Sequence, residues 1–491
     1  ENVLIAACFA KGVTKLRNCA LEPEINDLIN KMKLFGFHFA TLDIRQDSRV
    51  HHNVLSNIVE ESLEMGLDIF PKNYNKLSEE KQINALSKIV GKVNPSLFKH
   101  EMSRNTLESI YAMKTIQRNN GEMGSNRYII SNNGSVLNVM EAFAMIRMCD
   151  WEQPTTDVVP LFETVEDLED AHNVMETLYK NKAYAEHLKR RGNKQTIMLG
   201  FSDGTKDGGY LMANWGIYRA KEALSAISRK YGIKVVFFDG RGGPPARGGG
   251  KTHQFYASLG PTIENEEVQL TIQGQTISSN FGTPESCQYN LEQLLSSGIA
   301  NNVFANEKDR LGKEDRDTMD RLAKISYKAY VDFKNHPKFL PYLERMSTLK
   351  YYAKTNIGSR PSKRGGGDKL VFSDLRAIPF VGSWSQLKQN VPGFYGVGVA
   401  IQEFVDNNEF DKVQSLYQNS TFFRTLLENS MMSLTKSFFK LTAYMQDDKE
   451  FGAFWKIIHE EYERSKAMLL KLTGYSELME DTRSMKASIQ V

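Results

Sequence analysis

Acidic residues that could hold a metal ion end two apolar segments of this chain. Glu163 ends the segment 157–163, and Asp203 ends the segment 196–203. Hard carboxylate oxygens, with no Cys or His pair nearby, favour Mg²⁺ or Mn²⁺ over zinc. Lys206, in the glycine-rich turn that follows Asp203, could pair with a phosphate. The structural alternatives are an N-cap or first-turn acid on the following helix for each carboxylate, and a solvated charge for the lysine.

A glycine loop, residues 240–250, carries Arg241 and Arg247. It contains six glycines and two prolines, and it follows the apolar run 233–238, which is typical of a buried strand. Glycine lets the backbone approach a ligand closely, and each guanidinium can bind a carboxylate or phosphate through two hydrogen bonds. We therefore predict that the loop closes over an anion. The alternatives are a disordered linker, an RNA-contacting Arg-Gly-Gly segment and a plain turn; the spacing matches neither a P-loop nor a dinucleotide fingerprint.

Further arginines stand at the borders of apolar segments or in a second glycine loop. Arg45 ends an apolar segment, and a buried arginine needs an anionic partner. That partner would be Asp43, Asp47 or a substrate phosphate. Arg360 lies in a second basic glycine loop, and Arg376 follows it. Two such loops together favour an anionic substrate.

The segments that must position these residues alternate between short apolar runs and helical patterns. The predicted strands are 37–45, 128–132, 157–163, 196–203, 233–238, 268–277 and 376–381. The predicted helical regions include 1–34, 51–118, 287–356 and 415–472. This alternation predicts an α/β fold with a parallel sheet, in which ligands bind at the carboxyl ends of the strands. The polar residues at those ends are Arg45, Asn132, Glu163, Asp203 and Asp239.

Bulk composition is that of an ordinary globular protein. The 491 residues are 41% hydrophobic and 25% charged, and the net charge is +3, too small to indicate a nucleic-acid or membrane partner. One large α/β barrel with insertions can take up this length. The four cysteines lie far apart without a Cys-x-x-Cys pair, which favours a reduced intracellular compartment. No apolar run approaches the roughly 20 residues of a membrane span, and no secretory signal is expected.

Several motifs together resemble those of phosphoenolpyruvate carboxylases. They are Val-Pro-Leu-Phe-Glu-Thr at Glu163, Gly-Phe-Ser-Asp-Gly-Thr-Lys-Asp-Gly-Gly at Asp203, the doubled Arg-Gly-Gly loop, Gly-Ser-Arg-Pro-Ser-Lys-Arg at Arg360 and Leu-Arg-Ala-Ile-Pro-Phe at Arg376. Leu-Asp-Ile-Arg-Gln at Arg45 and the lysine at Lys436 match as well. The motifs occur in the order and spacing of that family, and the resemblance runs from the first residues to about residue 490.

The resemblance implies an incomplete (β/α)8 barrel embedded in a large excess of α-helices. Residues 1–400 would form the barrel-containing catalytic region, which lacks its N-terminal part. Residues 401–491 would form a helical region that packs on the barrel and carries part of an effector site. The implied reaction is the anaplerotic carboxylation of phosphoenolpyruvate with bicarbonate, giving oxaloacetate and phosphate. It implies a cytoplasmic homotetramer inhibited by aspartate or malate.

The resemblance also assigns roles to individual residues. Glu163 and Asp203 look like the ligands of Mg²⁺ or Mn²⁺, which holds phosphoenolpyruvate and then the enolate. The expected substrate-binding residues are Arg45, Arg360 and Arg376. The expected catalytic residues are Lys206, Asp239, Arg241 and Arg247. The expected effector-binding residues are Lys436 and Arg247.

Three departures from the family pattern stand out. The motif Thr-Ala-His-Pro-Thr is absent, so the chain is expected to be the carboxyl-terminal part of a longer enzyme, inactive by itself. The terminal Gln-Asn-Thr-Gly is also absent. Asp239 stands where most relatives have a histidine, and an ionised carboxylate would repel carboxyphosphate. We expect Asp239 to pair with a loop arginine; metal binding and protonation are the alternatives.

Three other functions remain open. The chain could be another barrel enzyme that handles phosphoenolpyruvate or pyruvate, such as an aldolase or a kinase. It could also be a non-catalytic module for ligand binding or assembly, since the histidine motif is missing. RNA binding through the Arg-Gly-Gly loop is disfavoured by the near-neutral net charge.

Overall fold

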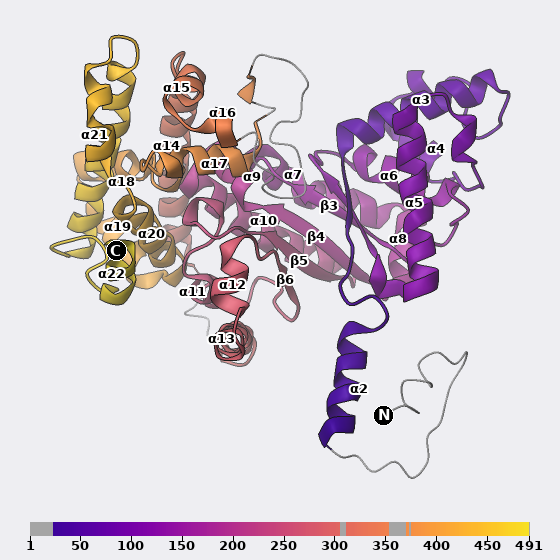
Figure 1. The fold of residues 1–491 in the computed structure, drawn as a ribbon, viewed down its shortest axis with the longest axis horizontal. Helices are drawn as coiled ribbons and strands as arrows, with labels where there is room; N and C mark the ends of the chain where they lie inside the picture. The colour runs from indigo at the N-terminus through magenta and orange to yellow at the C-terminus, as the bar shows by residue number, and fades with distance from the viewer. Residues whose placement is uncertain (1–22, 305–310, 353–369, 373–374, 491) are drawn as a thin grey trace. The chain divides into compact units, whose positions relative to one another are not determined.

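A computed structural model describes the chain except for residues 1–22, 305–310, 353–369, 373–374 and 491. The chain divides into two compact units, of which unit 1 comprises Glu1–Ile130 and Leu137–Val159. Unit 2 comprises Ser131–Val136 and Pro160–Val491. The elements of both units are labelled in Figure 1.

Unit 1 consists mainly of helices around a core of aliphatic side chains. Its elements are α2 (Pro23–Phe35), β1 (Ile44–Asp47), α3 (Ser48–Glu64), α4 (Glu79–Leu86), α5 (Glu101–Asn120), most of β2 (Arg127–Ser131) and most of α6 (Val136–Met148). Helix α3 starts at Asp47, whose carboxylate accepts a hydrogen bond from the Arg49 main chain and so caps the helix. Core residues such as Ile58, Leu107 and Ile110 are fully buried.

The parallel strands of unit 2 lead directly into several of the predicted site residues. The six strands found among the described residues form one sheet in the order β1-β2-β3-β4-β5-β6. Strands β3 (Asp157–Phe162), β4 (Lys194–Gly200), β5 (Lys234–Gly240) and β6 (Val268–Leu270) pair in parallel. In the register, Phe162 lies opposite Leu199, and Leu199 lies opposite Asp239. The strands read as continuous apolar runs because nearly all their residues are buried.

Helices follow each strand of unit 2 and continue to the end of the chain (Figure 1). Those between the strands are α7 (Val165–Lys180), α8 (Lys182–Arg190), α9 (Phe201–Gly208), α10 (Tyr210–Lys230) and α11 (Thr252–Ala257). After β6 come α12 (Gln275–Phe281), α13 (Pro284–Val303), α14 (Lys313–Lys334), α15 (Phe339–Met346) and α16 (Leu349–Tyr352). The last helices are α17 (Ala377–Gln386), α18 (Val397–Asp406), α19 (Phe410–Asn419), α20 (Thr421–Thr435), α21 (Gly452–Thr473) and α22 (Arg483–Gln490).

An aromatic cluster joins the later helices of unit 2. The ring of Phe333 on α14 stacks on those of Tyr395 and Phe454, with centroids 4.0 Å and 5.3 Å apart. Trp384 on α17 is fully buried beside Phe333, with centroids 6.1 Å apart. Offset or edge-on aromatic contacts at these distances stabilise a core beyond the area they bury.

The predicted α/β class and the parallel sheet are confirmed, but several predicted segments were wrong. Residues 37–45 form a strand only from Ile44, because positive φ angles at Gly36 and Phe39 turn the chain beforehand. The segment 268–277 is a strand only to Leu270, and a helix begins at Gln275. The segment 376–381 is not a strand but the start of α17, since a short apolar run does not distinguish a strand from a buried helix.

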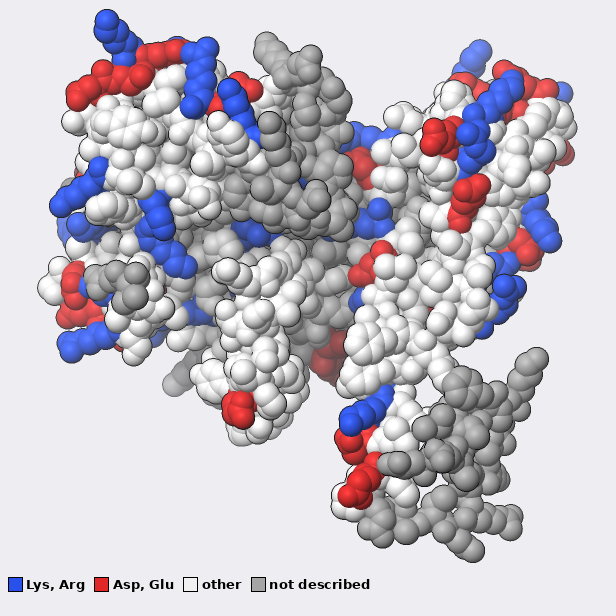
Figure 2. All heavy atoms as spheres, in the orientation of Figure 1, with Lys and Arg blue, Asp and Glu red and all other residues white. Residues whose placement is uncertain are grey.

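The region 415–472, predicted as continuous helix, is interrupted. Ser420 caps a new helix by accepting a hydrogen bond from the Phe423 main chain, and residues Phe439–Asp447 form a 3-10 helix. Among the described residues, no helix combines the length and the apolar character needed to cross a bilayer. Basic and acidic side chains are interspersed on the face drawn in Figure 2.

Candidate active site

Glu163 is held at the carboxyl end of β3. It is 3% exposed, and its Oε2 accepts a hydrogen bond of 2.6 Å from the main-chain N–H of Asn132. Gly200, at the end of the neighbouring strand, leaves room for it: a Cβ there would lie 3.2 Å from Cγ of Glu163. The acid is therefore packed against the end of β4 and is not a helix cap. The cap of the following helix is Thr164, whose hydroxyl accepts from the main chain of Asp167.

Asp203 lies beside that strand end, in the first turn of α9. The strand β4 stops at Gly200 and the helix starts at once, so the prediction of a strand up to Asp203 was wrong. Gly204, the next residue, faces the main-chain oxygen of Glu163. The amino-terminal turn of α9 thus lies against Glu163, and the helix dipole favours an anion or a carboxylate there.

The donor set at these two strand ends suits a hard divalent cation. A protein usually contributes one or two carboxylates to a Mg²⁺ site, and oxygens of water and substrate complete the coordination shell. Among the described residues, no group of three His, Cys, Asp or Glu side chains is placed to hold a metal ion. Glu163 and Asp203 are of the ligand type that a hard divalent cation takes.

The glycine loop is folded tightly on itself. The main-chain N–H of Gly242 donates to the oxygen of Arg247 at 2.7 Å, and that of Gly249 donates to Pro244 at 3.0 Å. A Cβ on Gly249 would overlap the main chain of Gly243, so no larger residue fits at that position. Gly248 has φ +79°, which favours glycine.

Arg247 connects the glycine loop to the start of α9. Its Nε donates to the hydroxyl of Ser202 at 3.1 Å, and its Nη2 donates to the side-chain oxygen of Gln273. Ser202 directly precedes Asp203. The loop therefore places a guanidinium at the residue that precedes Asp203.

Arg241 is buried among aromatic rings. It is 3% exposed, and its guanidinium lies 4.5 Å from the ring centroid of Phe255 and 5.3 Å from that of Phe201. Nε donates to the main-chain oxygen of Gly248, while Nη1 has no hydrogen-bond partner among the described residues. No carboxylate of the described chain lies within ion-pair distance of it. A buried cation with a spare donor can accept an anionic ligand.

Asp239 pairs with a lysine, which corrects the expected pairing with a loop arginine. Its Oδ2 accepts from Nζ of Lys221 on α10 at 2.7 Å and from the hydroxyl of Tyr256 at 2.6 Å. Both charged side chains are at most 1% exposed. Burial lowers the pKa of Lys221, and the carboxylate of Asp239 opposes that shift. Burial, followed by the same carboxylate, raises the pKa of Tyr256, which keeps its hydroxyl a donor.

The far end of the loop is fixed to α20. The main-chain N–H of Lys251 donates to Oδ1 of Asn429 at 3.0 Å, and its Nζ pairs with Glu428 at 2.9 Å. Gly250 has φ +93° and faces the same asparagine so closely that a Cβ would overlap it. Lys436 is the C-cap residue of α20, so the helix that holds the loop also leads to that lysine.

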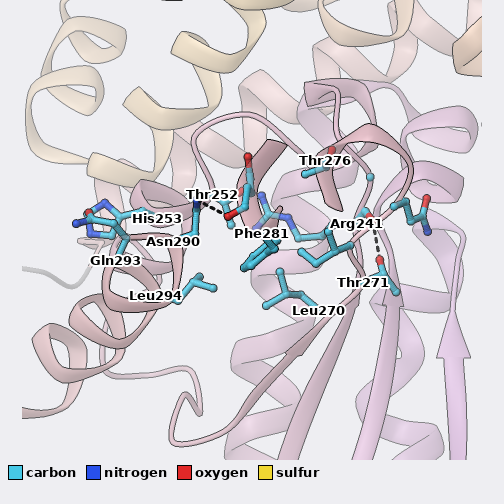
Figure 3. A pocket seen from close by; sticks show the side chains of 14 residues that line it. Arg241, Thr252, His253, Leu270, Thr271, Thr276, Phe281, Asn290, Gln293 and Leu294 are labelled. Atoms are coloured by element: carbon cyan, nitrogen blue, oxygen red, sulfur yellow. Dashed lines mark hydrogen bonds between the residues drawn. The ribbon is translucent and has the colours of Figure 1, made fainter. Parts of the chain in front are cut away.

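A small cavity of about 50 Å³, lined by both polar and apolar side chains, adjoins the loop (Figure 3). Arg241 lines it together with Thr252, Gln273 and Asn290. The hydroxyl of Thr271, also in its wall, donates to the main-chain oxygen of Arg241 at 2.6 Å. The cavity has room for water or one small anion.

A family model described as phosphoenolpyruvate carboxylase matches residues 10–491. The chain belongs to this family. Membership makes the protein a lyase that carboxylates phosphoenolpyruvate, so the predicted family and enzyme class are confirmed. The phosphoenolpyruvate carboxylase family implies phosphoenolpyruvate and bicarbonate as substrates, and its members use a divalent metal.

The other residues expected for a phosphoenolpyruvate carboxylase lie on α9, on β1, at the ends of α17 and α20, or outside the described residues. Nζ of Lys206 lies 4.7 Å from the ring centroid of Phe372, and Arg376 is the N-cap residue of α17. Arg45 lies on β1 in unit 1. Arg360 lies outside the described residues. Desolvation, and then the charge of Lys388, lowers the pKa of Lys436.

Sequence reasoning missed Lys221, although a signal for it exists. Lys221 follows Ile217 by four residues and precedes Leu224 by three, and both neighbours are buried. A lysine on the apolar face of a helix needs a buried anion. The spacing would have pointed to a partner such as Asp239.

Proposed function

We propose that this carboxylase transfers a bicarbonate-derived carboxyl group to phosphoenolpyruvate at the carboxyl ends of β3, β4 and β5. One observation supports this most: Glu163, the start of α9 with Asp203, and loop residue Arg247 are joined by direct packing and a hydrogen bond through Ser202. Two hard acids and two arginines in one place suit a phosphorylated carboxylic acid and a divalent metal. The sheet would then be part of a (β/α)8 barrel.

Glu163 and Asp203 would hold the Mg²⁺ or Mn²⁺ ion. When bound, the ion supplies Lewis-acid stabilisation of negative charge on the substrate oxygens. Arg241 and Arg247, with Lys206, would bind the phosphate and carboxylate, and Arg45, Arg360 and Arg376 would complete the substrate site. Positive donors fixed in a dry site stabilise developing negative charge more than they would in water.

The bond changes balance without an external oxidant or reductant. An oxygen of bicarbonate attacks phosphorus, and the bond between phosphorus and the enol oxygen breaks. Carboxyphosphate and the enolate of pyruvate result. Carboxyphosphate gives carbon dioxide and phosphate, and C3 of the enolate attacks carbon dioxide to give oxaloacetate. The closed glycine loop keeps water out, because a protonated enolate would leave as pyruvate.

Regulation and assembly are part of the same proposal. Lys436 and Arg247 would bind aspartate or malate, which would remove Arg247 from the substrate. The contacts of Lys251 with Glu428 and Asn429 support this, because they join the loop to the helix whose C-cap residue is Lys436. A cytoplasmic homotetramer is the proposed form of the full-length enzyme.

The test is bicarbonate-dependent oxaloacetate formation by the full-length protein with Mg²⁺ and bicarbonate labelled with ¹⁸O at all three oxygens. The proposed bond changes place one labelled oxygen in phosphate and two in the new carboxylate. Phosphate without label, or pyruvate as the main product, would contradict the proposal. Binding of aspartate without any turnover would instead favour a non-catalytic module.

A further inference from the structure

A buried ion pair lies directly behind the glycine loop. Lys221 and Asp239 are at most 1% exposed, and their charged atoms are 2.7 Å apart. Removing two charges from water is costly, and a well-packed apolar pair is often as stable. Tyr256 adds a hydrogen bond to the same carboxylate oxygen, while Oδ1 has no partner among the described residues. This partial satisfaction points to a role other than stability.

The carboxylate joins the two ends of the loop. Asp239 is the last residue but one of β5, immediately before the loop, and Tyr256 lies on α11, immediately after it. The bond of 2.6 Å between them therefore closes the base of the loop. The main-chain oxygen of Asp239 also accepts from Arg241 at 2.9 Å and from Thr271 at 3.1 Å. Both the side chain and the main chain of Asp239 therefore hold the start of the loop in place.

Lys221 and Arg241 are connected through Asp239 and the aromatic rings that follow the loop. The Lys221 ammonium lies 5.6 Å from the ring centroid of Tyr256, and the guanidinium of Arg241 lies 5.2 Å from the same centroid. Both cations also face the ring of Phe255, at 6.0 Å and 4.5 Å. The ring of Tyr256 is held by its hydrogen bond to Asp239. Contacts therefore run from Lys221 through Asp239 and Tyr256 to the loop arginine.

The charges of Lys221 and Asp239 also affect how Arg241 can bind an anionic ligand. An uncompensated carboxylate at Asp239 would oppose anionic substrates and would pair with Arg241 in their place. The ammonium of Lys221 balances that carboxylate at 2.7 Å. Arg241 is then left without a carboxylate partner among the described residues, and its charge stays available to a ligand.

We propose that Lys221 is a positioning residue for carboxylation, which acts through Asp239 and Tyr256 to hold the loop and keep Arg241 available to substrate. This inference rests on the proposed function. The two residues form a charge-matched pair, so the loss of either should be worse than the loss of both.

The experiment is a double-mutant cycle in the full-length protein. The variants are Lys221→Met, Asp239→Asn and the double variant, in which the Asn oxygen still accepts from Tyr256. Lys230→Met is the matched control, because that lysine lies on the same helix and pairs with Glu176 at an exposed site. The readouts are kcat, KM for phosphoenolpyruvate, the pH profile of kcat and the thermal midpoint Tm.

We expect each single variant to lower kcat by about tenfold or more, the loss expected from misplaced catalytic groups. The double variant should recover to within about threefold of wild type, as coupled neighbours do not add. Lys230→Met should behave like wild type. Independent, multiplying effects of the two substitutions would overturn the inference, as would an unchanged kcat in Lys221→Met. A lowered Tm with unchanged kcat in folded enzyme would show a structural role only and overturn it too. If the wild type itself forms no oxaloacetate, the proposed function fails instead.

Discussion

At the scale of single residues, the chemistry depends on acids that are held by the main chain. Glu163 accepts the N–H of Asn132, which lies on the preceding strand connection with φ +55°. That bond holds one carboxylate oxygen against the backbone. Burying a carboxylate is costly unless hydrogen bonds and positive charge compensate it.

Glu163→Gln should therefore lower kcat/KM by about 100-fold or more, the order seen when a group that stabilises developing charge is removed. The Gln oxygen can still accept from Asn132, so Tm should change little. The half-saturating Mg²⁺ concentration should rise in the same variant. Activity assays across a Mg²⁺ series measure both effects.

Glu461→Gln is the matched control for that substitution. Glu461 is also buried and accepts main-chain N–H groups, from Gly396 at 3.0 Å and from Val399 at 3.3 Å, but it lies on α21. Its variant should keep the Mg²⁺ dependence of wild type. An equal loss in both variants would mean that Glu163 acts only in folding.

At the scale of elements, the conformation of the glycine loop depends on close contacts of its main chain, which leave no space for a side chain at some of its glycines. Gly249 has an ordinary φ, yet a Cβ there would overlap the main chain of Gly243. Gly249→Ala should therefore open the loop and lower kcat by about tenfold or more, since displaced groups lose orientation. Circular dichroism should show unchanged helix content. Steady-state kinetics with phosphoenolpyruvate and bicarbonate measure the loss.

Gly91→Ala serves as the control for the loop variant. No atom lies within 4 Å of a Cβ at Gly91, and its φ is not positive. We expect wild-type kinetics there. Wild-type kinetics in Gly249→Ala as well would refute a tightly closed loop.

Whether an element could be predicted depended on how clearly its pattern of apolar residues indicated a strand or a helix. The strands at 128–132, 157–163 and 233–238 were found because buried parallel strands read as β-branched and aromatic runs. The run 376–381 has the same composition but forms the start of α17, and Pro379 is tolerated in its first turn. Local sequence does not carry the difference, because packing on neighbouring helices decides it.

The sequence predicted the site residues that follow the strands, but it did not predict their partners on the helices. Glu163, Asp203 and the loop arginines follow apolar runs, so parallel topology predicts their proximity. The partner of Asp239 was not predictable in this way, because Lys221 lies eighteen positions earlier on a helix. The bond between Asn429 and Lys251 spans 178 positions and depends on how α20 packs.

At the scale of the whole molecule, the chain divides into two compact units, and unit 1 contains a buried histidine that makes its stability depend on pH. In unit 1, His51 is fully buried, and its Nε2 lies 3.0 Å from the Tyr128 hydroxyl. Its Nδ1 has no hydrogen-bond partner among the described residues. Burial lowers the pKa of His51 to about 4, although the charge of Asp47 opposes the shift.

This histidine should make unit 1 less stable in mild acid. The folded pKa lies below that of the unfolded chain, so the unfolded state takes up the proton first as the pH falls from about 6.5 to about 4. The stability lost over that window is about 3 kcal/mol. His51→Gln should remove most of this pH dependence. Urea midpoints by pulse proteolysis at pH 7 and pH 4.5, with the cut sites in unit 1 identified, measure it; the same midpoint shift in both proteins would contradict the assignment.

The position of a bound metal tests the account most directly. Crystals of the full-length protein with Mn²⁺ and an unreactive phosphoenolpyruvate analogue would give an anomalous peak for the ion. We predict one peak with carboxylate oxygens of both Glu163 and Asp203 at about 2.1 Å, a typical distance for a small hard cation, and the analogue phosphate beside Arg241 and Arg247. A peak that lacks either acid, or an analogue bound away from the glycine loop, would contradict it.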